Sequence, residues 1–487
     1  MAIDDQTATS ATATAAAAAT GTPARSRLRG NLGVASIVFM VVAAASPLGV
    51  IGGPVPLGIT VGNGAGFPAT FIIATVVLLL FAVGFTTMTP HVKSAGAFYS
   101  YVDRSLGRAA GLGTGFAALL SYLTLEAAVF GLIGPGIDSL LGSYGVPSIP
   151  WWIYALVAFA VVVFLGYRNI ALSGRVLAVL LIAEVAIVLV LDAVIVFSGG
   201  GPEGLSTGIV TPSAILSGAP GIGILFAILS FIGFEATAVF RDEARDPDRT
   251  IPRATYLSLV LIGVFYAFSS WALISAVGDS KIVKTATDNG GTLLSDVTQR
   301  YLGTVGEHII QVLFVTSLFA CILSFHNIVS RYVFTLSARA ALPQRLGHAH
   351  GRFGSPHRAS IAAGVVVGVL LVVGAATGLD PINQYYTWLA GFSSVGIVLL
   401  LGITSVAVLV FFARNRTAAS LWRRAIAPAL GLVGLIVFLV LILQNLPTLV
   451  GGSVPLAVGI VVLLVLAFAL GPVVARLRAT AGRATDD

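Results

Sequence analysis

Four acidic side chains stand in the interior of long apolar runs of the sequence, several residues from the ends of the runs: Glu126, Glu184, Asp192 and Glu235. A charged side chain at the centre of a lipid bilayer costs about 2.5–3.5 kcal/mol, so its presence there needs a reason. An apolar environment disfavours the charged form of a carboxylate, which allows the group to take up and release a proton. The same group can pair with a cation or an amine. These four residues therefore point to proton exchange or cation binding.

Membrane-spanning helices are the elements that must position these side chains. The chain has 487 residues, of which 57% are hydrophobic and 10% are charged, whereas about a quarter of the residues of an average soluble domain are charged. This composition excludes a soluble globular enzyme and a disordered chain. It also excludes a disulfide scaffold, because the only cysteine, Cys321, has no partner for an internal disulfide. An open chain in lipid must satisfy its own backbone hydrogen bonds, which predicts an all-α membrane protein. We expect about twelve spans, at residues 32–62, 66–90, 109–138, 150–167, 172–198, 214–240, 254–277, 304–337, 359–377, 384–412, 425–446 and 454–475.

The basic residues predict the orientation of these spans. All but three of the 27 Lys and Arg residues fall on one side when the spans alternate from an N-terminus on the inside. The exceptions, Lys281, Lys284 and Arg300, share the loop after the seventh span. Basic loops stay in the cytoplasm, so we expect a multi-pass plasma-membrane protein with both termini cytoplasmic. The net charge of +7 is thus an orientation signal and does not indicate nucleic-acid binding.

Two spans carry helix-breaking residues. Span one has three prolines and three glycines within residues 47–56, and each proline inside a helix removes a backbone hydrogen bond. We expect a broken helix there, with a simple kink as the alternative. In span six, the segment from Ser230 to Gly233 precedes the carboxylate of Glu235. An inverted repeat of five helices would make spans one and six counterparts, and paired interrupted helices indicate a transport site. Their free ends suit a zwitterion such as an amino acid, because helix N-termini attract carboxylates and C-termini attract ammonium groups.

Several segments resemble those of the amino acid–polyamine–organocation permeases. The most specific is Gly233-Phe234-Glu235 with the loop at 242–254, which is similar to the Gly-Phe-Glu and Glu-x-x-x-Pro-x-x-x-Ile-Pro-x-Ala motifs of the family. Residues 326–332, continuing to 342–356, are similar to the end of helix eight and its Leu-Pro loop. Residues 94–99 match the Gly-(Gly/Ala)-x-Tyr segment after helix two.

The resemblance implies the leucine-transporter fold, with two inverted five-helix repeats, broken helices one and six, and two peripheral helices. We therefore expect a disordered cytoplasmic tail at 1–30, the first repeat at 31–200, the second at 201–415, helices eleven and twelve at 416–478, and a cytoplasmic tail at 479–487. The implied function is alternating-access transport of amino acids or related amines, usually proton-coupled. An exchanger of polyamines or cationic amino acids is the alternative.

The resemblance also places a substrate at the two breaks. The residues implied to bind it are Ala45, Ser46, Leu48, Gly49, Tyr122, Glu126, Ser230, Phe231, Ile232 and Gly233. Pro47 departs from the Gly-(Ser/Ala)-Gly pattern that is frequent in the family, and it has no amide hydrogen to offer a substrate carboxylate. Phe231 is expected to be an aromatic lid or, alternatively, a packing residue. Trp388 is expected to be an outer gate or an interfacial anchor.

Each carboxylate then receives an expected role. Glu184 falls close to the position of a lysine that replaces a sodium site in several family members, so we expect it to carry a proton or, alternatively, to bind a cation. A neutral Glu184 bonded to the helix backbone is the structural alternative. Glu126 is expected to pair with the distal ammonium of a cationic substrate or to form an interhelical hydrogen bond. Glu235 is expected to hold the broken helix, and Asp192 to be exposed at the outer rim.

Other classes of protein find little support. No His-Glu-x-x-His, Gly-x-Ser-x-Gly or paired mid-membrane histidines indicate a membrane-embedded enzyme, and no Walker motif indicates ATP-driven transport. The histidines of the loop at 339–358 fit no tetrahedral metal motif, so neither a metal nor a cofactor is expected. A proton gradient is the expected driving force, with sodium as the alternative. The expected partners are a small amino acid or amine and the lipid bilayer, and a solute sensor remains a further alternative.

Overall fold

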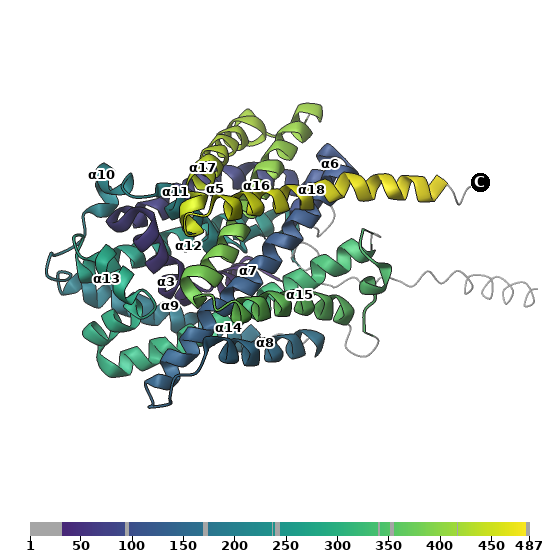
Figure 1. Cartoon of the computed structure of the whole chain (residues 1–487). Helices are drawn as coiled ribbons and strands as arrows, with labels where there is room; N and C mark the ends of the chain where they lie inside the picture. Colours follow the sequence, from purple (N-terminus) through teal and green to yellow (C-terminus); the bar gives the residue numbers. More distant parts are fainter. Residues whose placement is uncertain are drawn as a thin grey trace, which may run out of the picture.

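The computed structural model describes residues 32–483 apart from 93–96, 169–173, 236, 239–243, 339–340, 351–354 and 416. These residues form a bundle of helices (Figure 1), and their only β pairing is two isolated bridges. Eleven helices are long and apolar enough to span a membrane, and α11 (Pro220–Phe231) is a shorter apolar helix. The prediction of an all-α membrane fold is confirmed. The predicted tail at 1–30 and the motif residues 94–96 and 242–243 lie outside the described residues.

The helices follow the order of the predicted spans. The elements of the spans are α2 (Val34–Ala45), α3 (Pro47–Gly52), α4 (Pro54–Leu57), α5 (Phe67–Met88), α7 (Arg108–Gly142), α8 (Trp151–Arg168), α9 (Gly174–Phe197), α11, α12 (Pro247–Val277), α14 (Leu293–Ala338), α15 (His357–Ala376), α16 (Thr387–Arg414), α17 (Ala427–Leu449) and α18 (Val454–Arg483). Between them lie α6 (Ala97–Leu106), α10 (Pro212–Ile215), α13 (Ile282–Asn289) and the short 3-10 and π turns η1 (Gly58–Asn63), η2 (Gly64–Gly66), η3 (Thr89–His91), η4 (Gly208–Val210), η6 (Gln344–Gly347), η7 (Pro381–Tyr386) and η8 (Trp422–Ile426).

Some boundaries differ from those predicted. α12 begins at Pro247 and not at 254, and α18 continues to Arg483, into the range expected to be a tail. α14 begins at Leu293 but is kinked at Gly303, whose φ is 72°, next to the predicted start of span eight at 304. α6 and α13 were not predicted, because both are too polar to stand out as apolar runs.

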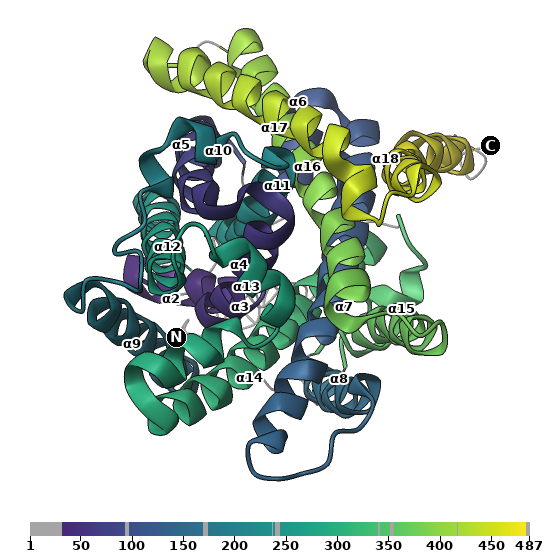
Figure 2. The ribbon, with the colours of Figure 1, turned by 60° about the vertical axis from the view of Figure 1, so that its left-hand side comes forward.

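α7 occupies the centre of the bundle. In the most apolar stretch of 18 residues of each helix, 89% of the residues of α7 are buried, compared with 22% for α8 and 28% for α18. Figure 2 shows α7 crossing the bundle beside α16, with α3 and α4 near the middle. Gly113 of α7 and Gly471 of α18 allow their helices to touch, because a Cβ at Gly471 would lie 2.1 Å from the Gly113 nitrogen. Small residues at such contacts are typical of helices packed in membranes.

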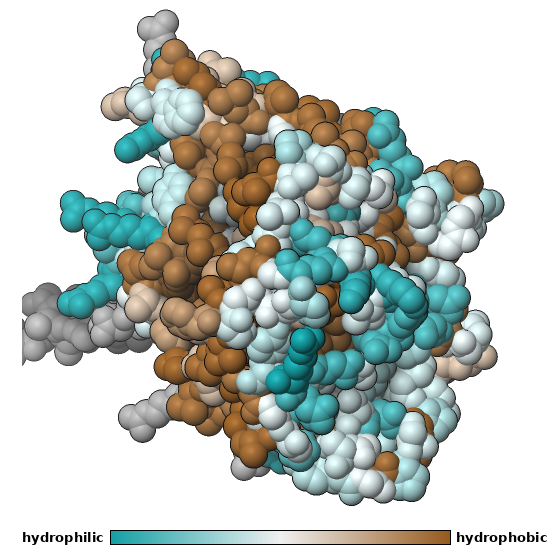
Figure 3. All heavy atoms as spheres, turned by 90° about the vertical axis from the view of Figure 1, so that its left-hand side faces the viewer, coloured by the Kyte–Doolittle hydropathy of each residue, from teal (hydrophilic) through white to brown (hydrophobic). Residues whose placement is uncertain are grey.

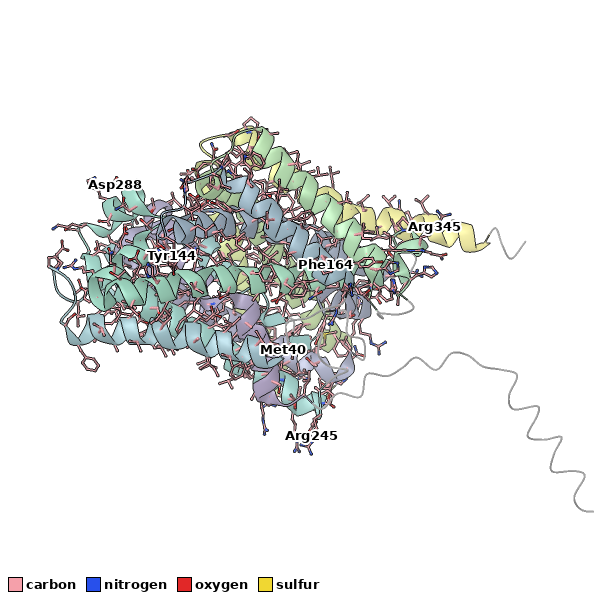
Figure 4. All side chains as sticks on the ribbon, turned by 90° about the horizontal axis from the view of Figure 1, so that it is seen from below. Met40, Tyr144, Phe164, Arg245, Asp288 and Arg345 are labelled. Carbon is pink, nitrogen blue, oxygen red and sulfur yellow. The ribbon has the colours of Figure 1, made fainter. Side chains whose placement is uncertain are left out.

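The outer helices turn apolar side chains away from the bundle, and polar residues gather at its ends. Phe164 on α8 and Val179 on α9, for example, are 54% and 66% exposed. Figure 3 looks onto the left-hand end of Figure 1 and shows hydrophilic residues across the middle and right of that end, with hydrophobic residues along its left and upper margin. In Figure 4, Asp288 lies toward one end of the bundle and Arg345 toward the other. Their loops therefore lie at opposite ends, as the predicted alternation of spans requires.

Candidate functional site

The first predicted break is present and lies at Ser46. α2 ends at Ala45, α3 begins at Pro47, and Ser46 between them has φ 51° and ψ 70°, in the left-handed region. No other described residue except glycine has a positive φ. Such a conformation costs about 1–3 kcal/mol and persists only where its surroundings impose it. Pro47 fixes the position of the break, because proline lacks an N–H and is tolerated in the first turn of a helix.

The second break follows α11. Ile232 is extended, with φ −59° and ψ 130°, and Gly233 has a φ of 116°, which favours glycine. The carboxylate of Glu235 accepts a hydrogen bond from the Gly233 amide at 3.0 Å and another from the Tyr122 hydroxyl on α7. Glu235 is 1% exposed. This carboxylate therefore ties the unwound segment to the central helix.

The two breaks line the same buried cavity. Its lining residues are Ala44, Ala45, Ser46, Gly49, Val50, Pro54, Leu125, Val129, Leu132, Leu229, Ile232, Leu318, Cys321, Phe325 and Tyr386. The volume is about 40 Å³, room for about three water molecules. No molecule as large as an amino acid fits until the surrounding helices separate.

The predicted substrate residues divide into two groups. Ala45, Ser46, Gly49 and Ile232 line the cavity. Leu48, Tyr122, Glu126, Ser230, Phe231 and Gly233 are not among its lining residues. The Ser230 hydroxyl donates to the backbone of its own helix, and the Phe231 ring lies 6.4 Å from that of Phe71, centroid to centroid. Phe231 is 1% exposed and is packed in the core in this conformation.

Glu184 on α9 lies beside the first break. Its Oε2 accepts hydrogen bonds from the Leu48 amide of α3 at 3.3 Å and from the Ser317 hydroxyl of α14 at 2.5 Å. Ser317 also shares a hydrogen bond of 2.8 Å with the Ser46 hydroxyl. One buried carboxylate thus joins the broken helix to α14. It also occupies the amide of Leu48, one of the residues predicted to bind the substrate.

Glu126 pairs with a histidine. Its Oε1 lies 2.7 Å from Nδ1 of His326 on α14, and Nε2 of the same imidazole lies 2.8 Å from the Ser360 hydroxyl on α15. All three residues are 0% exposed. Oε2 of Glu126 has no hydrogen-bond partner among the described residues. Glu126 thus makes the interhelical hydrogen bond that was one of its two predicted roles.

Asp192 and Trp388 are not among the residues that line the cavity. Asp192 is 2% exposed and accepts a hydrogen bond of 2.6 Å from Ser269 of α12. The prediction of an exposed rim residue is wrong, because α9 packs against α12 and covers the carboxylate. Trp388 is the second residue of α16 and packs against the apolar core.

The sequence did not single out several polar partners at the site. Tyr266 of α12 donates a hydrogen bond of 3.1 Å to the Ala45 carbonyl at the first break. Ser317, His326 and Tyr386 were also not assigned roles. Of these, His326 had a signal, since a histidine in the interior of the apolar run at 304–337, away from its ends, is as unusual as the four carboxylates. Among the residues that the structure describes, no three His, Cys, Asp or Glu side chains lie together in a way that could hold a metal ion.

Comparison with solved structures supports the predicted fold. A crystal structure of the Eremococcus coleocola manganese transporter, in complex with an aromatic bis-isothiourea substituted compound, superposes with a TM-score of 0.60. The match covers 93% of this chain and 99% of that one at 15% sequence identity. The two chains share the leucine-transporter fold.

Comparison with known sequences identifies the family. The low-affinity putrescine importer PlaP of Escherichia coli (strain K12) is 29% identical over 259 residues, or 51% of this chain and 55% of the importer. The aromatic amino acid transport protein AroP of the same strain is 24% identical over 373 residues, or 74% of this chain and 76% of AroP. The match thus spans only about half the length of PlaP. Both relatives are named as transporters and not as enzymes. The family described as amino acid permease matches residues 32–470, and the chain is therefore a multi-pass membrane protein that belongs to this family.

Proposed function

We propose that the protein is a secondary transporter that moves amino acids or related amines across the plasma membrane by alternating access. The observation that carries this proposal is the meeting of two interrupted helices at one buried cavity, where Ser46 breaks the first and Ile232 follows the end of the second. Secondary transporters of this architecture bind their substrates between such helices near the middle of the membrane. The names of the relatives, a putrescine importer and an aromatic amino acid transport protein, agree with an amine-bearing substrate.

The helix ends at the cavity favour an ammonium group. α2 and α11 each have 12 residues, and the last turns of both contribute lining residues, Ala44 and Ala45 from α2 and Leu229 from α11. The carbonyl groups at a helix C-terminus carry a partial negative charge. Two C-terminal ends that converge on one small space therefore supply an attractive site for a positively charged amine.

Glu184 is the group that we propose couples transport to a proton gradient. Hydrogen bonds to an ionised acceptor are roughly twice as strong as neutral ones, so protonation of Glu184 weakens its bonds from Leu48 and Ser317. The broken helix and α14 are then less firmly joined and can separate. A sodium ion held by the oxygens of Glu184, Ser46 and Ser317 is the alternative means of coupling.

Uptake into proteoliposomes tests the proposal. A labelled substrate that accumulates against its gradient when the outside is made acidic supports proton symport, and accumulation only with a sodium gradient supports sodium coupling. One-for-one exchange without either gradient supports an antiporter. Downhill flux at the rate of a channel would contradict secondary transport.

The variant Glu184→Gln tests the coupling role. Glutamine keeps the shape and the hydrogen-bond acceptor but cannot titrate, so we expect substrate binding to persist and the dependence of uptake on pH to disappear. Asp192→Asn is the matched control, because Asp192 lies on the same helix, is equally buried and also accepts a hydrogen bond from a serine. Retention of the normal pH profile in Glu184→Gln, or its loss in both variants, would contradict a coupling role specific to Glu184.

The proposed orientation has both termini in the cytoplasm. It is supported by the distribution of basic residues and by the placement of the loops of Asp288 and Arg345 at opposite ends (Figure 4). Single cysteines introduced at Asp288 and at Arg345, in a protein whose Cys321 is replaced by Ala, would show the orientation. An impermeant thiol reagent added to intact cells should label the first position and not the second.

A further inference from the structure

Beside the helix breaks, the cavity has an apolar wall formed by α7 and α14. Its residues follow one face of each of two helices, because they are spaced by three or four positions. They are Leu125, Val129 and Leu132 from α7 and Leu318, Cys321 and Phe325 from α14. A substrate held by its amine at the breaks would therefore extend its remaining atoms along apolar side chains.

No charged side chain is among the residues that line the cavity in the described structure. Each of the four carboxylates that the sequence singled out has a hydrogen-bond partner in another part of the protein. Glu126 pairs with His326 and Glu184 with Ser317 and the Leu48 amide, while Asp192 and Glu235 accept from Ser269 and Tyr122. None of the four lines the cavity in this arrangement, so none is placed against a substrate there to neutralise a second positive charge.

A second ammonium group would be costly here. A buried charge needs a partner of opposite sign or several hydrogen bonds, and the apolar wall offers neither. A diamine or a cationic amino acid would have to place its distal ammonium against Leu125, Val129 or Phe325. A neutral amino acid carries its own carboxylate beside its amine and enters with no net charge.

From this lining we infer that the transported molecule is a net-neutral amino acid with an apolar side chain, and that diamines and cationic amino acids are poor substrates. The inference rests on the proposed transport function and specifies its substrate. The helices must separate to admit any of these molecules. The class of substrate is therefore decided by the chemistry of the wall and not by the present volume of the cavity.

The test uses the purified full-length protein with leucine, alanine, lysine and putrescine as probes. Thermal-shift measurements and uptake into proteoliposomes should rank leucine and alanine ahead of lysine and putrescine. We expect the apparent affinity of leucine and of alanine to exceed that of lysine and of putrescine by about tenfold or more, since a tenfold ratio requires a difference in binding free energy of only about 1.4 kcal/mol. Val129→Asp adds a carboxylate to the wall and should lower leucine uptake while raising that of putrescine. Leu123→Asp is the control, because Leu123 lies on α7, is buried, and does not line the cavity.

Glu126→Gln provides a second control on the same helix. If Glu126 faces His326 and not the substrate, the ratio of leucine to lysine uptake should stay within about twofold of wild type. A change in that ratio, or a wild-type preference for lysine or putrescine, would overturn the substrate class and leave the transport function intact. Transport of none of the four probes, nor of any other amino acid or amine, would overturn the proposed function itself.

Discussion

Removal of His326 should expose how strongly the buried pair with Glu126 holds the bundle together. In His326→Leu, Glu126 loses the only hydrogen-bond partner of its Oε1 that the structure shows, while its Oε2 has none among the described residues. The carboxylate is 0% exposed, so water does not replace the imidazole. Breaking a buried charged pair by removing one partner costs about 3–5 kcal/mol. Leaving a buried neutral polar group without a partner costs less, about 1–3 kcal/mol.

The double variant Glu126→Leu/His326→Leu distinguishes this cost from a simple loss of packing. Replacing both members of a buried pair with apolar residues of similar size is often neutral, and the Ser360 hydroxyl can bond to its own helix. We therefore expect the double variant to be more stable than His326→Leu, with a coupling energy of about 2–3 kcal/mol. Tryptophan fluorescence during unfolding in mixed detergent and SDS micelles gives the free energies. Single-variant costs that add to within about 0.5 kcal/mol in the double variant would refute the reasoning.

Two further predictions concern backbone positions. A Cβ at Gly166 would lie 2.5 Å from the His326 imidazole, so Gly166→Ala should cost about 1–3 kcal/mol. Gly402→Ala, which meets no atom within 4 Å in α16, should be neutral or stabilising by up to about 1 kcal/mol. Melting temperatures measured at one scan rate compare the two, and equal losses would contradict the prediction. At the left-handed Ser46, Ser46→Val should be less stable than Ser46→Gly by about 1–3 kcal/mol, because only glycine adopts that conformation readily. Equal melting temperatures for these two variants would show that the break does not constrain its backbone.

The sequence predicted the helices and the first break well, for a physical reason. Apolar length and the position of prolines act locally, so the runs at 66–90 and 150–167 correspond closely to α5 and α8. The density of prolines and glycines in residues 47–56 likewise identified an interrupted helix, and Pro47 directly follows the break. α6 and α13 were missed because amphipathic helices outside the apolar runs carry no such signal.

The partners of the buried carboxylates could not be predicted in the same way. Each pair joins residues far apart in the chain, such as Glu126 and His326 or Glu184 and Ser317. Helical periodicity shows which residues share a face of one helix but not which helix that face meets. Asp192 illustrates the limit: its position near the end of a span indicated exposure, and only the packing of α9 against α12 shows that it is covered.

The thiol of Cys321 can report the conformation of the wild-type protein. It is the only cysteine among the 487 residues, it lines the cavity, and it is 6% exposed. A water-soluble maleimide therefore has a single target, which it reaches when the helices separate. Applied from one face of the membrane or the other, the reagent modifies this thiol at a rate set by how often the cavity opens to that face. The alternation between the two openings can thus be timed without first building a cysteine-free background.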